Sequence, residues 1–188
     1  MEKNNFKLKG TYLTTTKKFL EKEFGKDYAN QIFSKYYPGI VVLSSSWYSA
    51  SPLIQMLYDC AAGKNINFRE FMIKSTTFTL ETDLNGVYKF FMKLGGIKRI
   101  IDALPQLGNS YSNWIDLKVT GNIDKQVLLD IMIPSQYEEY FINGHEGALS
   151  GILNVCGKRL LAYTKLNRQI IMKDGNEFSK LNVEVRYE

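Results

Sequence analysis

The spacing of apolar residues changes once along the chain, near Trp114, and this change limits the folds that the chain can adopt. Before residue 108, apolar residues recur every three or four positions, which is typical of amphipathic helices. After Trp114 they alternate with polar residues, as in strands that bury one face. The final segment, 180–187, shows the alternation without a break. The sequence therefore predicts a helical half followed by a sheet.

The alternating half divides into four strands and one helix. We expect strands at 115–120, 127–133, 160–172 and 181–187. A hairpin turn is expected at Asp174–Gly175, and residues 144–156 keep a helical spacing between the two strand pairs. This order predicts an α+β fold: a helical N-terminal half packed on a four-stranded antiparallel sheet, with one helix inserted between the strand pairs. We expect one domain, 1–188, with its mainly helical half at 1–108 and the sheet plus inserted helix at 109–188.

Helices in the first half are expected at 16–24, 28–36, 52–63, 67–79, 84–94 and 97–104. Asp83 is expected to cap the fifth of these, and Gly95–Gly96 to separate the last two. Threonines are weak helix formers, so we expect those between 76 and 79 to bend or loosen the fourth helix. Pro105 is expected to help end the helical half.

The inserted helix carries small residues on one face. Gly144, Gly147, Ala148 and Gly151 are spaced so that they lie on the same side. Each glycine in a helix costs roughly 1 kcal/mol relative to alanine, so a contact must offset the cost. Two interpretations are open: a helix or sheet packed unusually close, or a ligand that touches the backbone.

The residues that most catalytic and metal sites need are scarce. His145 is the single histidine, and Cys60 and Cys156 are the two cysteines. Cys156 lies roughly 16 Å along the same helix from His145, too far to act with it. We interpret His145, next to Glu146 at a helix start, as a surface or capping residue. No phosphate-binding glycine loop or zinc spacing is present. We therefore expect neither an enzyme nor a metal site, and we expect free thiols.

Charge and hydropathy limit the classes of binding partner that we expect. The net charge is +5, and residues 158–173 hold five basic and no acidic side chains. Such a run is usually a solvated face, and with only Tyr163 interleaved for stacking, nucleic acid is not expected as a partner. No apolar run approaches the roughly 20 residues that span a bilayer. The opening MEKNNFKLKG has no apolar segment, so we expect a cytoplasmic protein without a membrane span.

Aromatic residues are abundant, with 11 Phe, 12 Tyr and 2 Trp. They could line an apolar cavity between the helices and the sheet, or fill a solid core. The residues that we expect at a ligand-binding cavity are Phe71, Phe78, Tyr88, Phe91, Trp114 and Tyr163, with Gly147 and Gly151 on the face that allows close approach.

Four strings carry a resemblance to a known family: KGTYLTTTKKFLEKEFGKDYANQIF, DLNGVYKFFMKLGGIKRI, GHEGALSGILNVCGKRLLAYTKL and FSKLNVEVRY. In order and spacing they resemble the haem–nitric oxide/oxygen-binding (H-NOX) sensor domains. They also resemble two related groups, the vinyl-reductase-type small-molecule-binding domains and an uncharacterised myxobacterial-type family. The resemblance implies an H-NOX-like fold and a sensor or ligand-binding role in signalling.

The chain departs from that family at the haem-binding positions. The family's iron-ligating histidine should fall within 84–104, where this chain has none. The family's Tyr-x-Ser-x-Arg motif aligns with 131–137, which reads IMIPSQY and lacks the arginine. The resemblance thus implies a haem-free, non-catalytic domain. Such a domain would have no cofactor and would bind a small apolar ligand.

Two alternatives remain open. The first is a protein-interaction module that meets a partner or a second copy; a core without a cavity of roughly 300 Å³ would favour it. The second is haem held by a non-histidine ligand, Tyr88 or Cys156.

Overall fold

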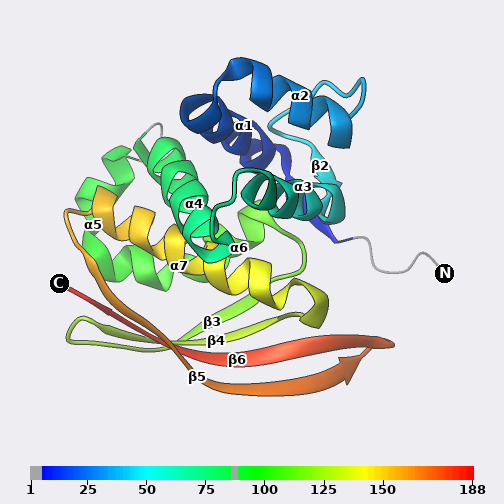
Figure 1. Cartoon of the computed structure of the whole chain (residues 1–188). Coiled ribbons are helices and arrows are strands. Elements are labelled where there is room, and N and C mark those ends of the chain that lie inside the picture. Colours follow the sequence, from blue (N-terminus) through cyan, green and yellow to red (C-terminus); the bar gives the residue numbers. More distant parts are fainter. Residues whose placement is uncertain (1–5, 86–88) are drawn as a thin grey trace.

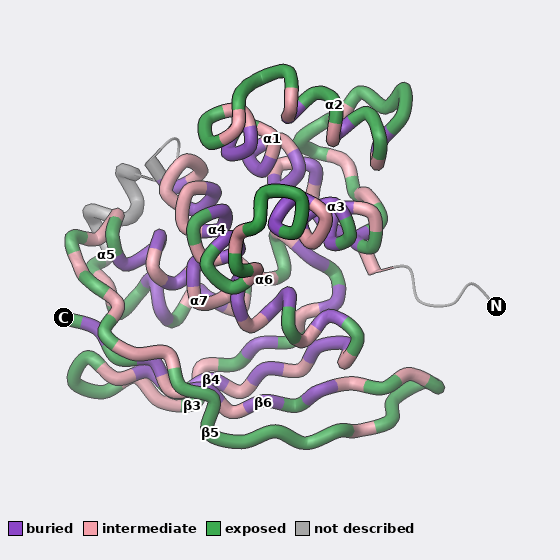
Figure 2. The backbone as a smooth tube through the Cα atoms, viewed as in Figure 1, coloured by how far each residue is buried: buried purple, intermediate pink, exposed green. Residues whose placement is uncertain are grey.

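The computed structural model describes the backbone of residues 6–85 and 89–188, and the side chains of these residues outside 85–95. Helices cover one face of the large sheet, and the other face is open (Figure 1). Helix α7, Glu138–Val155, lies between the sheet and α4, Phe68–Asn85. Buried residues concentrate where these layers meet, while the edge strand of the sheet is largely exposed (Figure 2). None of the described helices is both long and apolar enough to cross a membrane.

The helical half follows the expected order with shifted boundaries. Besides α4, its helices are α1 Gly10–Phe24, α2 Lys26–Tyr36, α3 Ala50–Gly63, α5 Lys89–Asp102 and α6 Leu104–Tyr111. Gly96 has a φ of 65°, so the predicted break within α5 is confirmed. A short antiparallel pair that the sequence pattern did not indicate joins β1, Lys7–Lys9, to β2, Trp47–Ser49. Strands of three residues are too short to show a period.

Three local predictions in this half were wrong. Helix α4 continues past the predicted end at residue 79 to Asn85, and within it Thr76 Oγ1 donates to the Met72 carbonyl at 2.8 Å. Asp83 is not a cap: it lies inside α4, and its carboxylate accepts a hydrogen bond from the Tyr111 hydroxyl at 2.7 Å. Pro105 lies in the first turn of α6, where its missing N–H costs nothing, instead of ending the helical half.

The predicted four-stranded antiparallel sheet is confirmed. Its strands are β3 Asp116–Ile123, β4 Gln126–Pro134, β5 Leu160–Lys173 and β6 Asn176–Tyr187, in the spatial order β3-β4-β6-β5. Leu181 pairs with Ile131, and Val183 with Leu129; all four side chains are buried under the helices. The Asp174–Gly175 hairpin has positive φ at both residues, as its turn type requires.

The inserted helix starts earlier than expected. A 3-10 turn, Ser135–Tyr137, leads directly into α7, which begins at Glu138 instead of residue 144. The Glu138 carboxylate accepts hydrogen bonds from Ser179 Oγ at 2.5 Å and from Arg168 Nε at 2.8 Å. These contacts lower the Glu138 pKa, and they connect the start of α7 to β5 and β6. Part of the basic charge of segment 158–173 is therefore paired within the molecule.

Candidate functional site

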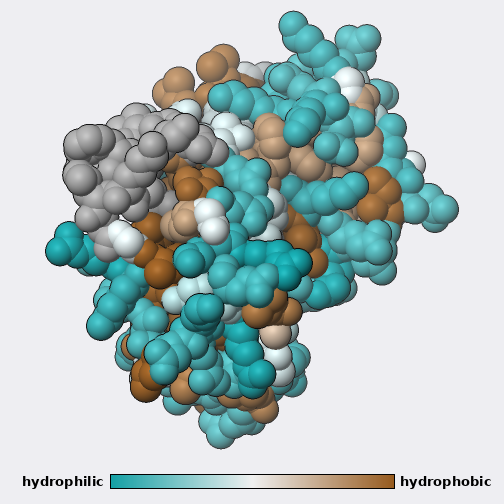
Figure 3. Space-filling view, turned by 90° about the vertical axis from the view of Figure 1, so that its left-hand side faces the viewer, coloured by the Kyte–Doolittle hydropathy of each residue, from teal (hydrophilic) through white to brown (hydrophobic). Residues whose placement is uncertain are grey.

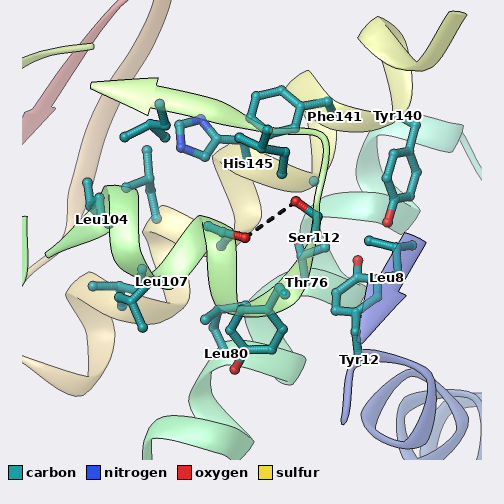
Figure 4. A pocket seen from close by; sticks show the side chains of 18 of the residues that line it. Leu8, Tyr12, Thr76, Leu80, Leu104, Leu107, Ser112, Tyr140, Phe141 and His145 are labelled. Atoms are coloured by element: carbon teal, nitrogen blue, oxygen red, sulfur yellow. Dashed lines mark hydrogen bonds between the residues drawn. The ribbon is translucent and has the colours of Figure 1, made fainter. Parts of the chain in front are cut away.

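A pocket of about 120 Å³ lies where α6 and α7 meet α1, α4 and the strands β1 and β3 (Figure 4). Its wall is almost entirely apolar. The lining residues are Leu8, Tyr12, Thr76, Leu80, Leu104, Leu107, Gly108, Tyr111, Ser112, Trp114, Ile115, Leu117, Tyr140, Phe141, Gly144, His145, Ala148, Leu149 and Ile152. The sequence placed a cavity between the helices at 84–104 and the sheet, and of the described residues in that segment only Leu104 is among those that line this pocket.

His145 forms part of this wall, so its interpretation as a surface or capping residue was wrong. Its ring stacks on Phe141, with ring centroids 5.0 Å apart and an interplanar angle of 18°. Its Nδ1 lies 2.9 Å from the Tyr163 hydroxyl oxygen. Burial lowers the His145 pKa to about 4, which keeps the imidazole neutral at pH 7. The same effect raises the Tyr163 pKa, so the phenol stays protonated.

Most hydroxyls around the pocket are bonded within the protein. Tyr12 and Tyr140 turn their hydroxyls toward each other (Figure 4), and burial raises the Tyr12 pKa to about 12. Ser112 Oγ donates to the Gly108 carbonyl at 3.3 Å. The Trp114 indole is different: its Nε1 is buried and has no hydrogen-bond partner among the described residues. Several hydroxyls of the wall thus have hydrogen-bond partners within the protein, whereas the Trp114 N–H has none among the described residues.

The two predicted glycines lie beside the pocket wall and face helix α4. A Cβ placed on Gly147 would come 2.2 Å from Thr76 Oγ1 and 2.5 Å from the Ile73 carbonyl oxygen. A Cβ on Gly151 would come 2.7 Å from the Thr77 carbonyl oxygen. Of the two interpretations of this face, unusually close helix packing is the one that the structure shows.

The predicted aromatic residues are distributed over several parts of the molecule. Trp114 lines the pocket. Phe71 and Phe78 pack against Phe19, at centroid distances of 5.7 and 5.8 Å, in the contact between α1 and α4. Tyr163 is not among the residues that line the pocket, but it contacts the lining residue His145. Tyr88 and the side chain of Phe91 lie outside the described residues.

The sequence reasoning missed Tyr140, Phe141 and His145 as site residues. Phe141 and His145 are four positions apart, which on a helix places them on one face. This signal was available, but it is informative only if the helix includes residue 141. The predicted helix began at residue 144, so the pair was divided by the predicted boundary.

The pocket can be tested for its fit to haem. Pockets for drug-sized ligands begin at roughly 300 Å³, and a porphyrin needs at least that much space; this pocket holds about 120 Å³. None of the described lining residues is a lysine or arginine that could bind the propionates. Segment 131–137, with which the family's motif was aligned, contains no arginine, and its Tyr137 hydroxyl is 2.7 Å from Ser51 Oγ. His145 on the wall is of a type that ligates haem iron, but its Nδ1 bonds the Tyr163 hydroxyl and the pocket lacks room for the porphyrin. The residues present do not fit haem.

Solved structures share this architecture at low sequence identity. An oxygen-binding H-NOX domain related to soluble guanylate cyclases superposes with a TM-score of 0.73 at 14% identity, covering 96% of this chain and 95% of the other. A structure concerned with the mechanism of H-NOX activation gives 0.74 at 15% identity, covering 96% and 97%. A variant H-NOX from T. Tengcongensis gives 0.73 at 16% identity, covering 96% and 98%.

Sequence comparison adds nothing to this likeness: no family model matches the chain, and no significant match was found among the curated proteins. The structural likeness extends over nearly the whole chain and includes the helical half, the antiparallel sheet and the inserted helix. The predicted fold is therefore confirmed, and the chain has the H-NOX fold.

Proposed function

We propose that this chain is a haem-free, non-catalytic sensor or small-molecule-binding domain, with its ligand in the pocket between α6 and α7. The observation that carries the proposal is a small apolar pocket at the junction of the helical half and the sheet, whose described lining has no lysine or arginine for a porphyrin's propionates. An engineered apolar cavity of roughly 150 Å³ binds benzene. A ligand of comparable size would therefore fill this pocket.

A ligand in this position would contact four helices and two strands at once. Ligand binding stabilises whichever arrangement of these elements closes best around it. The pocket is thus placed to convert occupancy into a change in helix packing, which is what a sensor requires. No chemistry on the ligand is needed for this role.

Native mass spectrometry of protein purified gently from its host tests the proposal, together with absorption spectra of protein expressed with haem supplied. We expect a small bound molecule, or stabilisation by a panel of small cyclic compounds from benzene to indole, and no Soret band. A ligand at 100 times its Kd stabilises by about 2.7 kcal/mol, which a thermal shift detects readily. A stoichiometric Soret band would overturn the haem-free proposal. No shift with any member of the panel, and no co-purified molecule, would overturn the ligand.

A protein-interaction module is the second candidate, and two observations favour it. The pocket volume, about 120 Å³, is below the roughly 300 Å³ whose absence would favour an interaction module over a ligand-binding domain. Strand β5 is a sheet edge with exposed apolar side chains, among them Leu161, Leu166 and Met172. On the face in Figure 3, however, hydrophobic residues form small separate groups instead of one broad area. Sedimentation equilibrium distinguishes the candidates: a dimer that Leu166→Glu dissociates would support the interaction module.

A further inference from the structure

The proton on the His145 imidazole can be placed from its neighbours. The Tyr163 phenol stays protonated, and its only hydrogen-bond partner among the described residues is His145 Nδ1, at 2.9 Å. A buried hydroxyl hydrogen without an acceptor is costly, so Tyr163 donates and Nδ1 accepts. A neutral imidazole that accepts at Nδ1 carries its hydrogen on Nε2. The hydrogen bond from Tyr163 therefore fixes the His145 tautomer that carries its hydrogen on Nε2, which makes Nε2–H a donor.

That donor has no partner within the described part of the chain. His145 is half-buried on the pocket wall, and its hydrogen bond to Tyr163 is made by the other nitrogen, Nδ1. The neighbouring hydroxyls of Thr76 and Ser112 already donate to backbone carbonyls. Trp114 Nε1 is a second N–H without a described partner on the same wall. An N–H donor without a protein partner on an otherwise apolar wall favours a ligand that supplies an acceptor.

We propose that the pocket selects small apolar molecules that carry one hydrogen-bond acceptor, such as a cyclic ketone, and that His145 Nε2–H donates to that acceptor. This rests on the proposed ligand-binding function and adds the ligand's chemical class. Tyr163 is the positioning residue, because it fixes the imidazole tautomer without contacting the ligand. The apolar remainder of the wall accounts for the preference for a compact hydrocarbon body.

The experiment compares two probes of the same shape, cyclohexanone and methylenecyclohexane, which differ in a carbonyl oxygen against a CH₂ group. Because His145 is the only histidine in the sequence, protein labelled with ¹⁵N-histidine reports on this one imidazole without assignment. We expect wild type to bind cyclohexanone about tenfold more tightly, as one hydrogen bond allows. Cyclohexanone should shift the Nε2 resonance, and methylenecyclohexane should leave it in place.

Two variants complete the test. In His145→Phe both probes should still bind, and the preference should lose most of its tenfold size, because Trp114 Nε1–H is then the remaining donor of the two. In Tyr163→Phe, His145 remains but its tautomer is released, so the ¹⁵N spectrum should show mixed Nδ1–H and Nε2–H forms and the preference should shrink. A role of Tyr163 in stability alone would leave the tautomer of the folded protein unchanged.

The failures can be told apart. If wild type binds both probes equally and the Nε2 resonance does not move, the acceptor selectivity is wrong, while ligand binding in the pocket stands. If neither probe binds wild type at millimolar concentration, both this inference and the proposed ligand-binding function lose their support.

Discussion

His145 lies between the Phe141 ring and the Tyr163 hydroxyl, and burial lowers its pKa to about 4. In the unfolded chain the pKa of a histidine is roughly 6.5. Between these values the unfolded state binds a proton that the folded state does not. Folding stability therefore falls as the pH drops through this window, and the effect is absent above it.

We expect this single residue to destabilise the fold by about 2 kcal/mol at pH 5 relative to pH 7, since each unit of pKa difference corresponds to about 1.4 kcal/mol. Urea unfolding of wild type and His145→Phe at both pH values measures it. The free-energy difference between the two proteins should change by that amount, because the phenylalanine variant lacks the titrating group. An imidazole signal constant from pH 7 to 5 should accompany it.

The comparison between variants is needed because other groups also lose stability in acid. Hydrogen bonds from Tyr36, Gln55 and Lys35 lower the Asp59 pKa to about 2, and the pKa of Glu138 is lowered as well. These carboxylates affect both proteins alike, so their contribution cancels in the difference. A difference that does not vary with pH would show that His145 is hydrated and titrates normally.

Among the elements, the contact between α4 and α7 depends most directly on residue type. The absence of a side chain at Gly147 allows the α4 backbone to approach, and Thr77 Oγ1 donates to the Gly147 carbonyl at 2.9 Å across the contact. This arrangement fixes the position of α7, and with it the pocket wall that Phe141 and His145 provide. The cost of the glycines is thus offset by helix packing.

Gly147→Ala should destabilise the protein by about 2–3 kcal/mol, because overpacking against a backbone carbonyl exceeds the roughly 1 kcal/mol that alanine gains in a helix. For a chain of this length that corresponds to a fall of about 5–10 °C in Tm. Thermal unfolding measures it.

Gly63→Ala is the matched control, because Gly63 ends α3 and has nothing within 4 Å of its added Cβ. It should leave stability unchanged or raise it by less than about 1 kcal/mol. Equal effects at the two glycines would mean that α4 and α7 are not in close contact at Gly147.

At the scale of the whole molecule, the fold was more predictable than the site for a physical reason. Alternation such as Leu181, Val183 and Val185 records burial locally, so the strands could be read from short windows. The environment of His145 is created by Tyr163, on a strand that meets α7 only in the folded chain. The glycine spacing predicted a close contact, but it carried no information on whether a helix or a ligand makes that contact.

Filling the pocket should raise the stability of the free protein and abolish ligand binding, and Ala148→Leu tests this for the molecule as a whole. Ala148 lines the pocket, so a leucine there can occupy much of the 120 Å³ and should stabilise the free protein by about 1 kcal/mol. The variant should no longer be stabilised by cyclohexanone, whereas wild type should gain about 2.7 kcal/mol at 100 times its Kd. The order of stability should therefore reverse when the probe is added.

Ala62→Leu, the same change at an exposed position of α3, should alter neither value by more than about 0.5 kcal/mol. If Ala148→Leu destabilises the protein, or still responds to cyclohexanone as wild type does, the pocket is not the ligand site.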